Sequence, residues 1–158
     1  MTKIHNTSSC PREFIDDADS LSPMKTIALG SAAGSERLYV NIDYIKPGAK
    51  SAKYHSHSLQ EEFFLILKGS GVLRINDEMI EVSAGDFVAK PAGKGIAHQF
   101  INNGDDILQI LDCGTKDRGD VVTYPDEGII FVKDIGKAFK GENHEQQWSS
   151  EPICDSLN

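Results

Sequence analysis

Two histidines and two glutamates lie close together in the stretch YHSHSLQEEFF, residues 54–64. On an extended strand, side chains two residues apart point to the same face, about 7 Å apart, whereas on a helix they diverge. His55 and His57 therefore converge if this stretch is extended. Glu62 begins an apolar run, and strand parity favours it over Glu61 as the carboxylate that faces the histidines. His98, after the turn-forming residues PAGKGIA, is the fourth candidate.

Three imidazoles and one carboxylate form a donor set typical of divalent first-row metals, here Mn, Fe, Co, Ni or Zn. Four protein donors on a six-coordinate ion leave two positions open, where a substrate can displace water. The donor types do not choose among these metals. The residues alone also admit a plainer interpretation, in which the histidine pair is exposed surface chemistry and His98 is a hydrogen-bonded structural histidine.

Residues that share the predicted strand faces with these donors are candidates for the wall of a pocket. Phe64 and Ile66 share the face predicted for the glutamate, and Phe100 shares the face predicted for the third histidine. Lys53 has the parity of the histidine pair and is a candidate for a substrate contact.

The composition of the chain excludes several classes of protein. The 158 residues are 39% hydrophobic and 25% charged, which is ordinary for one globular domain. The net charge of −8 argues against nucleic acid as a partner, since phosphate binding needs a basic surface. No apolar run approaches the ~18 residues of a membrane span, and the N-terminus lacks the apolar segment of a secretion signal. Three widely spaced cysteines fit a reducing compartment, so we expect a cytoplasmic protein. From the charge and the absence of a long apolar run, we expect neither nucleic-acid nor membrane partners.

The pattern of strands and turns predicts an all-β fold. Short apolar or alternating segments recur about every 8–12 residues, separated by turn residues, as in a sandwich or barrel. The segment RLYVNIDYI alternates with a period of two, and the polar turn at 76–78 predicts a hairpin. Four glycines stand where turns requiring positive φ are expected, namely Gly48, Gly69, Gly85 and Gly93. No convincing helical pattern is present.

Two segments of the chain resemble the two motifs of the cupin superfamily. The first reads G(x)6HSH(x)4E(x)6G over residues 48–69, and the second reads GD(x)4PAG(x)4H(x)3N over residues 85–102. Two spacings are longer than the common pattern. Six residues rather than five separate Gly48 from His55, and four rather than two separate Gly93 from His98. The resemblance covers roughly residues 37–113. The downstream TYPDEG and FVKDIGKAF resemble one branch, the small single-domain cupins with a YPD segment after the barrel, which mostly lack an assigned activity.

The resemblance implies a small β-barrel, a double-stranded β-helix or jelly roll, with one divalent metal inside it. Carried over position by position, it makes His55, His57, Glu62 and His98 the metal ligands. Small barrels of this kind leave a sheet edge and face exposed, so we also expect a homodimer. The predicted organisation is an N-terminal arm over residues 1–34, the cupin barrel over 35–135 and a polar C-terminal tail over 136–158.

Three kinds of function remain open at this point. The first is an enzyme that uses the metal as a Lewis acid on a small oxygen-rich metabolite, such as a sugar, keto acid or carboxylate, in an isomerisation or decarboxylation. With Fe or Mn, the same centre would suit a dioxygenase. The second is a non-catalytic module that binds or senses a small molecule. The third, a structural or storage role, is disfavoured because the chain is a single small acidic barrel.

Overall fold

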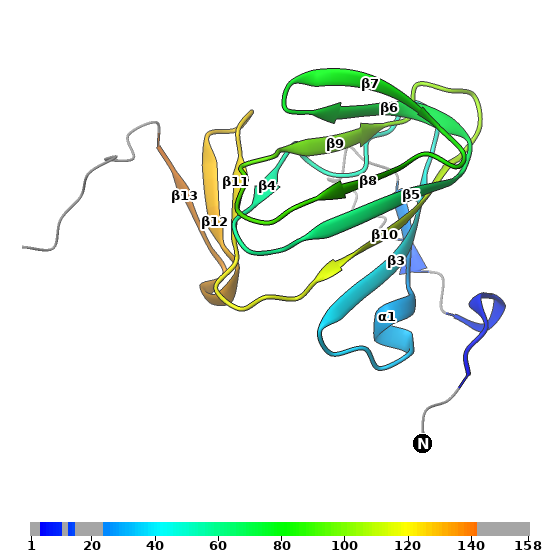
Figure 1. Cartoon of the computed structure of the whole chain (residues 1–158), viewed down its shortest axis with the longest axis horizontal. Helices are drawn as coiled ribbons and strands as arrows, with labels where there is room; N and C mark the ends of the chain where they lie inside the picture. Colours follow the sequence, from blue (N-terminus) through cyan, green and yellow to red (C-terminus); the bar gives the residue numbers. More distant parts are fainter. Residues whose placement is uncertain (1–3, 11–12, 15–23, 142–158) are drawn as a thin grey trace, which may run out of the picture.

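The computed structural model describes residues 4–10, 13–14 and 24–141, which form two facing layers of antiparallel strands (Figure 1). The first layer has six strands, in the spatial order β1 (Glu13–Phe14), β2 (Met24–Ala28), β3 (Leu38–Ile45), β10 (Leu108–Thr115), β5 (Glu62–Lys68) and β8 (Phe87–Lys90). The long central strands β3 and β10 pair along their whole length, from Leu38 opposite Thr115 to Ile45 opposite Leu108.

The second layer is built from two smaller sheets. One contains β7 (Glu78–Ser83), β6 (Ser70–Ile75) and β9 (His98–Ile101). The other contains β13 (Lys137–Lys140), β12 (Ile129–Val132), β11 (Val121–Tyr124) and β4 (Ser56–His57). A bridge between His55 and His98 joins the two sheets, because each of these residues donates its backbone N–H to the carbonyl of the other, at 3.2 and 2.9 Å. The layers together form the jelly-roll barrel that the sequence predicted.

The hydrophobic core lies between the layers. It is made of inward-facing side chains from both, which alternate with outward-facing ones along each strand. Its buried members are Ile45, Ala49, Phe64, Ile66, Leu73, Val82, Phe100, Leu108 and Ile110. Phe64 and Phe100 are packed edge to face, with ring centroids 5.1 Å apart, and lie beside the candidate donors.

The predicted turns are confirmed. The β6–β7 hairpin has a two-residue loop in which Asn76 and Asp77 have φ angles of 48° and 63°, as in a type I′ turn. All four singled-out glycines have positive φ. At Gly69, between β5 and β6, a Cβ atom would also lie 2.7 Å from the carbonyl oxygen of Ile107, so this tight connection needs glycine.

The N-terminal segment, in which the sequence indicates an arm or loop with a short strand over residues 25–29, contributes strands β1 and β2 to the six-stranded sheet. Strand β2 pairs with β3 from Met24 opposite Ile45 to Ala28 opposite Asn41. A single helical turn, α1 (Leu29–Ala32), follows it and was not predicted. Its Gly30 approaches β3 so closely that a Cβ would lie 2.8 Å from the Val40 nitrogen, so the turn depends on tertiary contact rather than on helical periodicity.

Two 3-10 turns complete the description, η1 (Thr7–Ser9) and η2 (Lys133–Ile135). Strand β13 pairs with β12 at the edge of the second layer. The rest of the predicted polar tail, from residue 142 on, lies outside the described residues.

Candidate functional site

The structure brings the four candidate donors to one end of the barrel interior. His55 and His57 come from β4 and the residue before it, Glu62 begins β5 and His98 begins β9. Donor atoms of His55, Glu62 and His98 all lie within 4.8 Å of one another, and His57 Nε2 is 3.6 Å from Glu62 Oε1. Glu62 is only 4% exposed, whereas Glu61 points to solvent. The triad of His55, Glu62 and His98 could hold a metal ion.

The orientation of the first two histidines suits metal binding. The Nδ1 atom of His55 lies 2.6 Å from the carbonyl oxygen of Lys53, and that of His57 lies 2.6 Å from Oδ2 of Asp120. Each oxygen accepts, so each Nδ1 carries the proton and each Nε2 is unprotonated, and the Nε2 atom of His57 accepts from the side-chain amide of Gln60 at 3.4 Å. Metal-ligating histidines are commonly oriented in this way.

Burial keeps the imidazoles neutral. It lowers the pKa of His55 to about 4 and that of His98 to about 3, and it also lowers the pKa of His57. Burial alone would raise the pKa of Glu62, but the charge and hydrogen bond of Lys90, together with His98 and His57, outweigh it and lower that pKa to about 2. At neutral pH the three imidazoles are therefore uncharged and the carboxylate is ionised, as metal binding requires.

Lys90, the last residue of β8, is a buried cation within this cluster that was not predicted from the sequence. Its side chain is 3% exposed, and its Nζ contacts Glu62 Oε2 and lies 2.8 Å from His98 Nδ1. Burial lowers the pKa of Lys90, while the carboxylate of Glu62 opposes that effect. Lys90 pairs directly with Glu62 and shares the inward face of Val88. Strand parity could therefore have indicated that the Lys90 side chain points inward.

Asp120 supports the centre from behind His57 and was also missed. It is 0% exposed, and besides His57 it accepts from the backbone N–H of Leu59 at 3.0 Å and from Lys133 Nζ at 3.2 Å. These bonds hold the pKa of Asp120 below its usual range although burial opposes them. No local pattern could have identified Asp120, since it lies 63 residues from its histidine partner.

The opposite wall of the site carries two further carboxyls and a phenol. Burial raises the pKa of Asp43 to about 6, and burial together with the nearby Asp43 raises that of Asp112 to about 8. Tyr39 donates its hydroxyl to Glu62 Oε1 at 3.0 Å. Oδ1 of Asp112 is buried without a hydrogen-bond partner. Groups that titrate near neutral pH therefore lie beside the candidate metal donors.

The candidate metal donors and the residues of this wall line a cavity of about 210 Å³. Of the predicted wall residues, Phe64 and Phe100 line it, whereas Ile66 is in the core and lines a neighbouring cavity. The prediction for Lys53 differs from the structure, because its side chain is 65% exposed and its ammonium lies 3.5 Å from Glu127. Residues 51–54 form bends rather than a regular strand, so the period-two parity does not extend back to Lys53.

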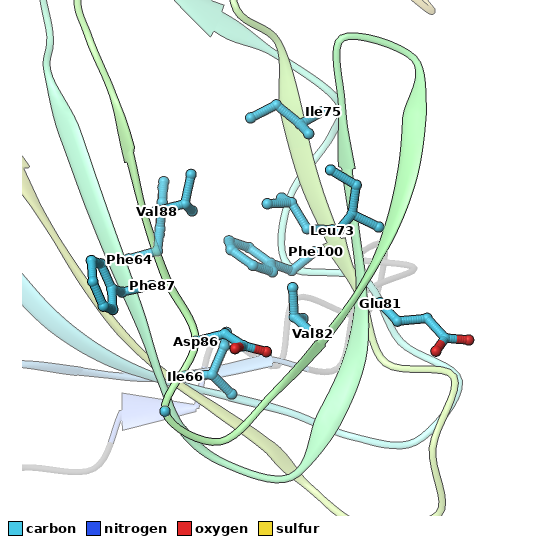
Figure 2. A pocket seen from close by; sticks show the side chains of 12 residues that line it. Phe64, Ile66, Leu73, Ile75, Glu81, Val82, Asp86, Phe87, Val88 and Phe100 are labelled. Carbon is cyan, nitrogen blue, oxygen red and sulfur yellow. The ribbon is translucent and has the colours of Figure 1, made fainter.

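A larger cavity of about 470 Å³ shares Phe64 and Phe100 with the first one (Figure 2). Ile66 and Val88 lie on one side of it, and Leu73 and Val82 on the other. Its lining is almost wholly apolar, and its two acidic residues, Glu81 and Asp86, are exposed. The smaller cavity is the better candidate for chemistry, because the polar and titratable groups converge there.

Comparison with known proteins agrees with this architecture. Residues 42–114 match the cupin domain family. A crystal structure from Acidithiobacillus ferrooxidans, provisionally assigned as a sugar phosphate isomerase, is 30% identical over 73% of this chain and 74% of its own, with a TM-score of 0.69. A sugar phosphate isomerase of the cupin superfamily from Silicibacter pomeroyi is 28% identical over 81% of this chain and 85% of its own, with a TM-score of 0.73.

A third structure, a predicted oxalate decarboxylase from Thermotoga maritima, is 22% identical over 72% of this chain and 98% of its own, with a TM-score of 0.61, and supports the fold alone. A comparison with proteins of curated function finds no match. Across residues 4–10, 13–14 and 24–141, no helix is long and apolar enough to span a membrane. Together, the antiparallel barrel and the histidine–glutamate cluster define a small β-barrel protein with a possible metal centre. The chain belongs to the cupin superfamily.

Proposed function

We propose that this cupin is a divalent-metal-dependent enzyme that isomerises a small sugar or sugar phosphate in the cavity of about 210 Å³. The observation that carries this proposal is the placing of Asp112 and Asp43, with their raised pKa values, in the same cavity as the candidate metal donors. Moving a hydrogen between adjacent carbons needs a group that accepts and returns a proton near neutral pH. The likeness to two structures assigned as sugar phosphate isomerases supports the substrate class.

Each residue of the site has a role under this proposal. His55, His57, Glu62 and His98 would hold the metal, which when bound supplies a Lewis acid for a substrate oxygen. In its ionised form Asp112 accepts the proton from one carbon and returns it to the next, and burial together with Asp43 raises the pKa of Asp112 to about 8. Phe64 and Phe100 close the inner end of the cavity and exclude water from it.

The test is proton exchange at the substrate carbon, followed by NMR in D2O with a panel of aldose and ketose phosphates. The untagged protein is loaded in turn with Mn, Fe, Co, Ni and Zn. We expect the wild type to exchange and isomerise at least one member of the panel. Glu62→Gln should slow the reaction by more than about 100-fold because it removes a charged ligand, while Glu61→Gln, on the exposed neighbour, should leave it unchanged.

The alternatives give different results in the same experiment. Equal losses in the two glutamine variants would contradict the assignment of Glu62. Ligand binding without turnover would indicate a binding or sensing module. Oxygen consumption with Fe or Mn alone would indicate a dioxygenase.

We further propose that the protein is a homodimer in the cytoplasm. The free cysteines Cys10 and Cys113 support a reducing compartment. The outer face of the six-stranded sheet supports the dimer, because it presents apolar side chains from four adjacent strands: Val40, Ile42, Phe63, Leu65, Leu67, Phe87, Leu111 and Cys113.

A further inference from the structure

Lys90 occupies a position that none of the expected roles in the site explains. Its amine contacts Glu62 Oε2 and lies 2.8 Å from Nδ1 of His98. Both partners belong to the triad whose donor atoms lie within 4.8 Å of one another. Metal–ligand bonds to nitrogen and oxygen are about 2.0–2.2 Å long, so a group this close to two donors lies within the space that a metal and its ligands would fill.

The hydrogen bond to His98 also bears on metal binding. An ammonium group only donates, so the Nδ1 atom of His98 accepts and its Nε2 atom carries the proton. A histidine in this tautomer has no free lone pair with which to bind a metal. The other two histidines differ, because Lys53 O and Asp120 Oδ2 accept from their Nδ1 atoms and leave Nε2 unprotonated.

We propose that Lys90 is an internal cation that competes with the divalent metal for Glu62 and His98, so that metal binding requires the lysine side chain to leave the donors. This inference rests on the proposed metal centre and adds a determinant of its affinity. In the metal-free protein the ammonium compensates the buried carboxylate, whose burial alone would be costly. The barrel therefore has a charge-compensated state without metal, and the metal enters by exchange with the ammonium.

Among the lysines near the site, the exchange is assigned to Lys90 because its ammonium contacts the triad. The side chain is 3% exposed and extends from the inward face of β8 opposite Glu62. The other lysine near the site, Lys133, lies 2.8 Å from Gln60 Oε1 and 3.2 Å from Asp120 Oδ2, and no contact with the triad is described for it. Lys94, in the turn between β8 and β9, is exposed and is a matched control.

The test is the dissociation constant of Co²⁺ and Zn²⁺, measured by calorimetry and by the visible absorption of Co²⁺ on untagged, EDTA-treated protein. We expect Lys90→Met to bind both ions at least about ten-fold more tightly than the wild type, and Lys94→Met to bind like the wild type. Lys90→Gln, which keeps a hydrogen-bonding group without charge, is measured beside it, and circular dichroism checks that each variant is folded.

A second measurement uses the wild type alone. Lysine-selective ¹⁵N NMR should show a Lys90 ammonium signal protected from exchange in the metal-free protein and displaced at saturating Zn²⁺. Equal affinities in the wild type and both Lys90 variants, or a Lys90 signal that does not respond to bound Zn²⁺, would overturn the competition while leaving the metal centre intact. Absence of metal binding in the wild type and in every variant would overturn both the competition and the proposed centre.

Discussion

Asp120 acts on the candidate centre only through the groups it orients. Its carboxylate accepts from His57 Nδ1, which leaves Nε2 of that histidine free to face Glu62. Asparagine at this position has nearly the same shape but presents an N–H group toward the imidazole, or turns its single oxygen away from the backbone N–H of Leu59. The Asp120→Asn substitution therefore changes the tautomer of His57 while leaving the packing around it nearly the same.

We expect Asp120→Asn to weaken divalent-metal binding by about 10- to 100-fold, because the favoured tautomer of His57 is lost. Calorimetry with Zn²⁺ measures this effect, and urea unfolding of the metal-free protein measures stability separately. Asp117→Asn, in an exposed segment, is the control. Unchanged metal affinity in a folded Asp120→Asn variant would show that Asp120 has a structural role only.

Among the strands, β3 turns polar side chains toward the candidate site and its apolar side chains away from it. The apolar residues Val40 and Ile42 pair with Cys113 and Leu111 on the outside of the barrel. The inward residues include Tyr39 and Asp43, which line the cavity with the donors. This orientation is the reverse of the usual one, in which the apolar face of a strand covers the core and the polar face points to solvent.

The inward placing of Asp43 has a measurable effect on stability. Its pKa rises from 3.8 to about 6, so the folded state binds the proton more tightly than the unfolded state does. This contribution to stability is fully present below about pH 4 and is lost as the pH rises through 6, a loss of about 3 kcal/mol for an isolated group. Asp112, its neighbour across the strands, is held protonated to higher pH by the same interaction.

We expect Asp43→Asn, which can keep the hydrogen bond from Thr26, to raise the free energy of unfolding at pH 7.5 by up to about 3 kcal/mol and to have little effect near pH 4. Urea denaturation of EDTA-treated protein at the two pH values measures the difference. Asp105→Asn, in an exposed turn, should have no effect at either pH. The same change in stability at both pH values would contradict the raised pKa of Asp43.

At the scale of the whole molecule, the proposed dimer follows from the outer face of the six-stranded sheet. Phe87 is 71% exposed there and stacks on Phe63, with ring centroids 6.0 Å apart. A glutamate in this patch would be buried and unpaired in a dimer, which is strongly unfavourable. We expect light scattering at micromolar concentration to give a dimer for the wild type and a monomer for Phe87→Glu. Met79→Glu, on the exposed strand β7 of the other layer, should remain dimeric, and a monomeric wild type would refute the proposal.

Local patterns in the chain were sufficient for the all-β class, the central strands and the turns between them. The hairpin at Asn76-Asp77 and the connection at Gly69 depend on backbone preferences of the residues themselves, so they could be predicted without any partner. The candidate donors His55, His57, Glu62 and His98 could be named for a related reason, since their residue types, parity and motif spacing are all visible in the sequence.

Only the tertiary structure decided what surrounds those donors. Lys90 meets Glu62 through the register of β8 on β5, and Asp120 meets His57 across 63 residues of chain. The inward turn of the polar face of β3 depends on the pairing of β3 with β10. Such contacts depend on how distant strands pair, and local preferences do not determine that pairing, because a shift of one residue exchanges every side chain between the two faces. The sequence therefore supplied the candidate ligands, and the fold supplied the cation, the orienting carboxylate and the titratable wall around them.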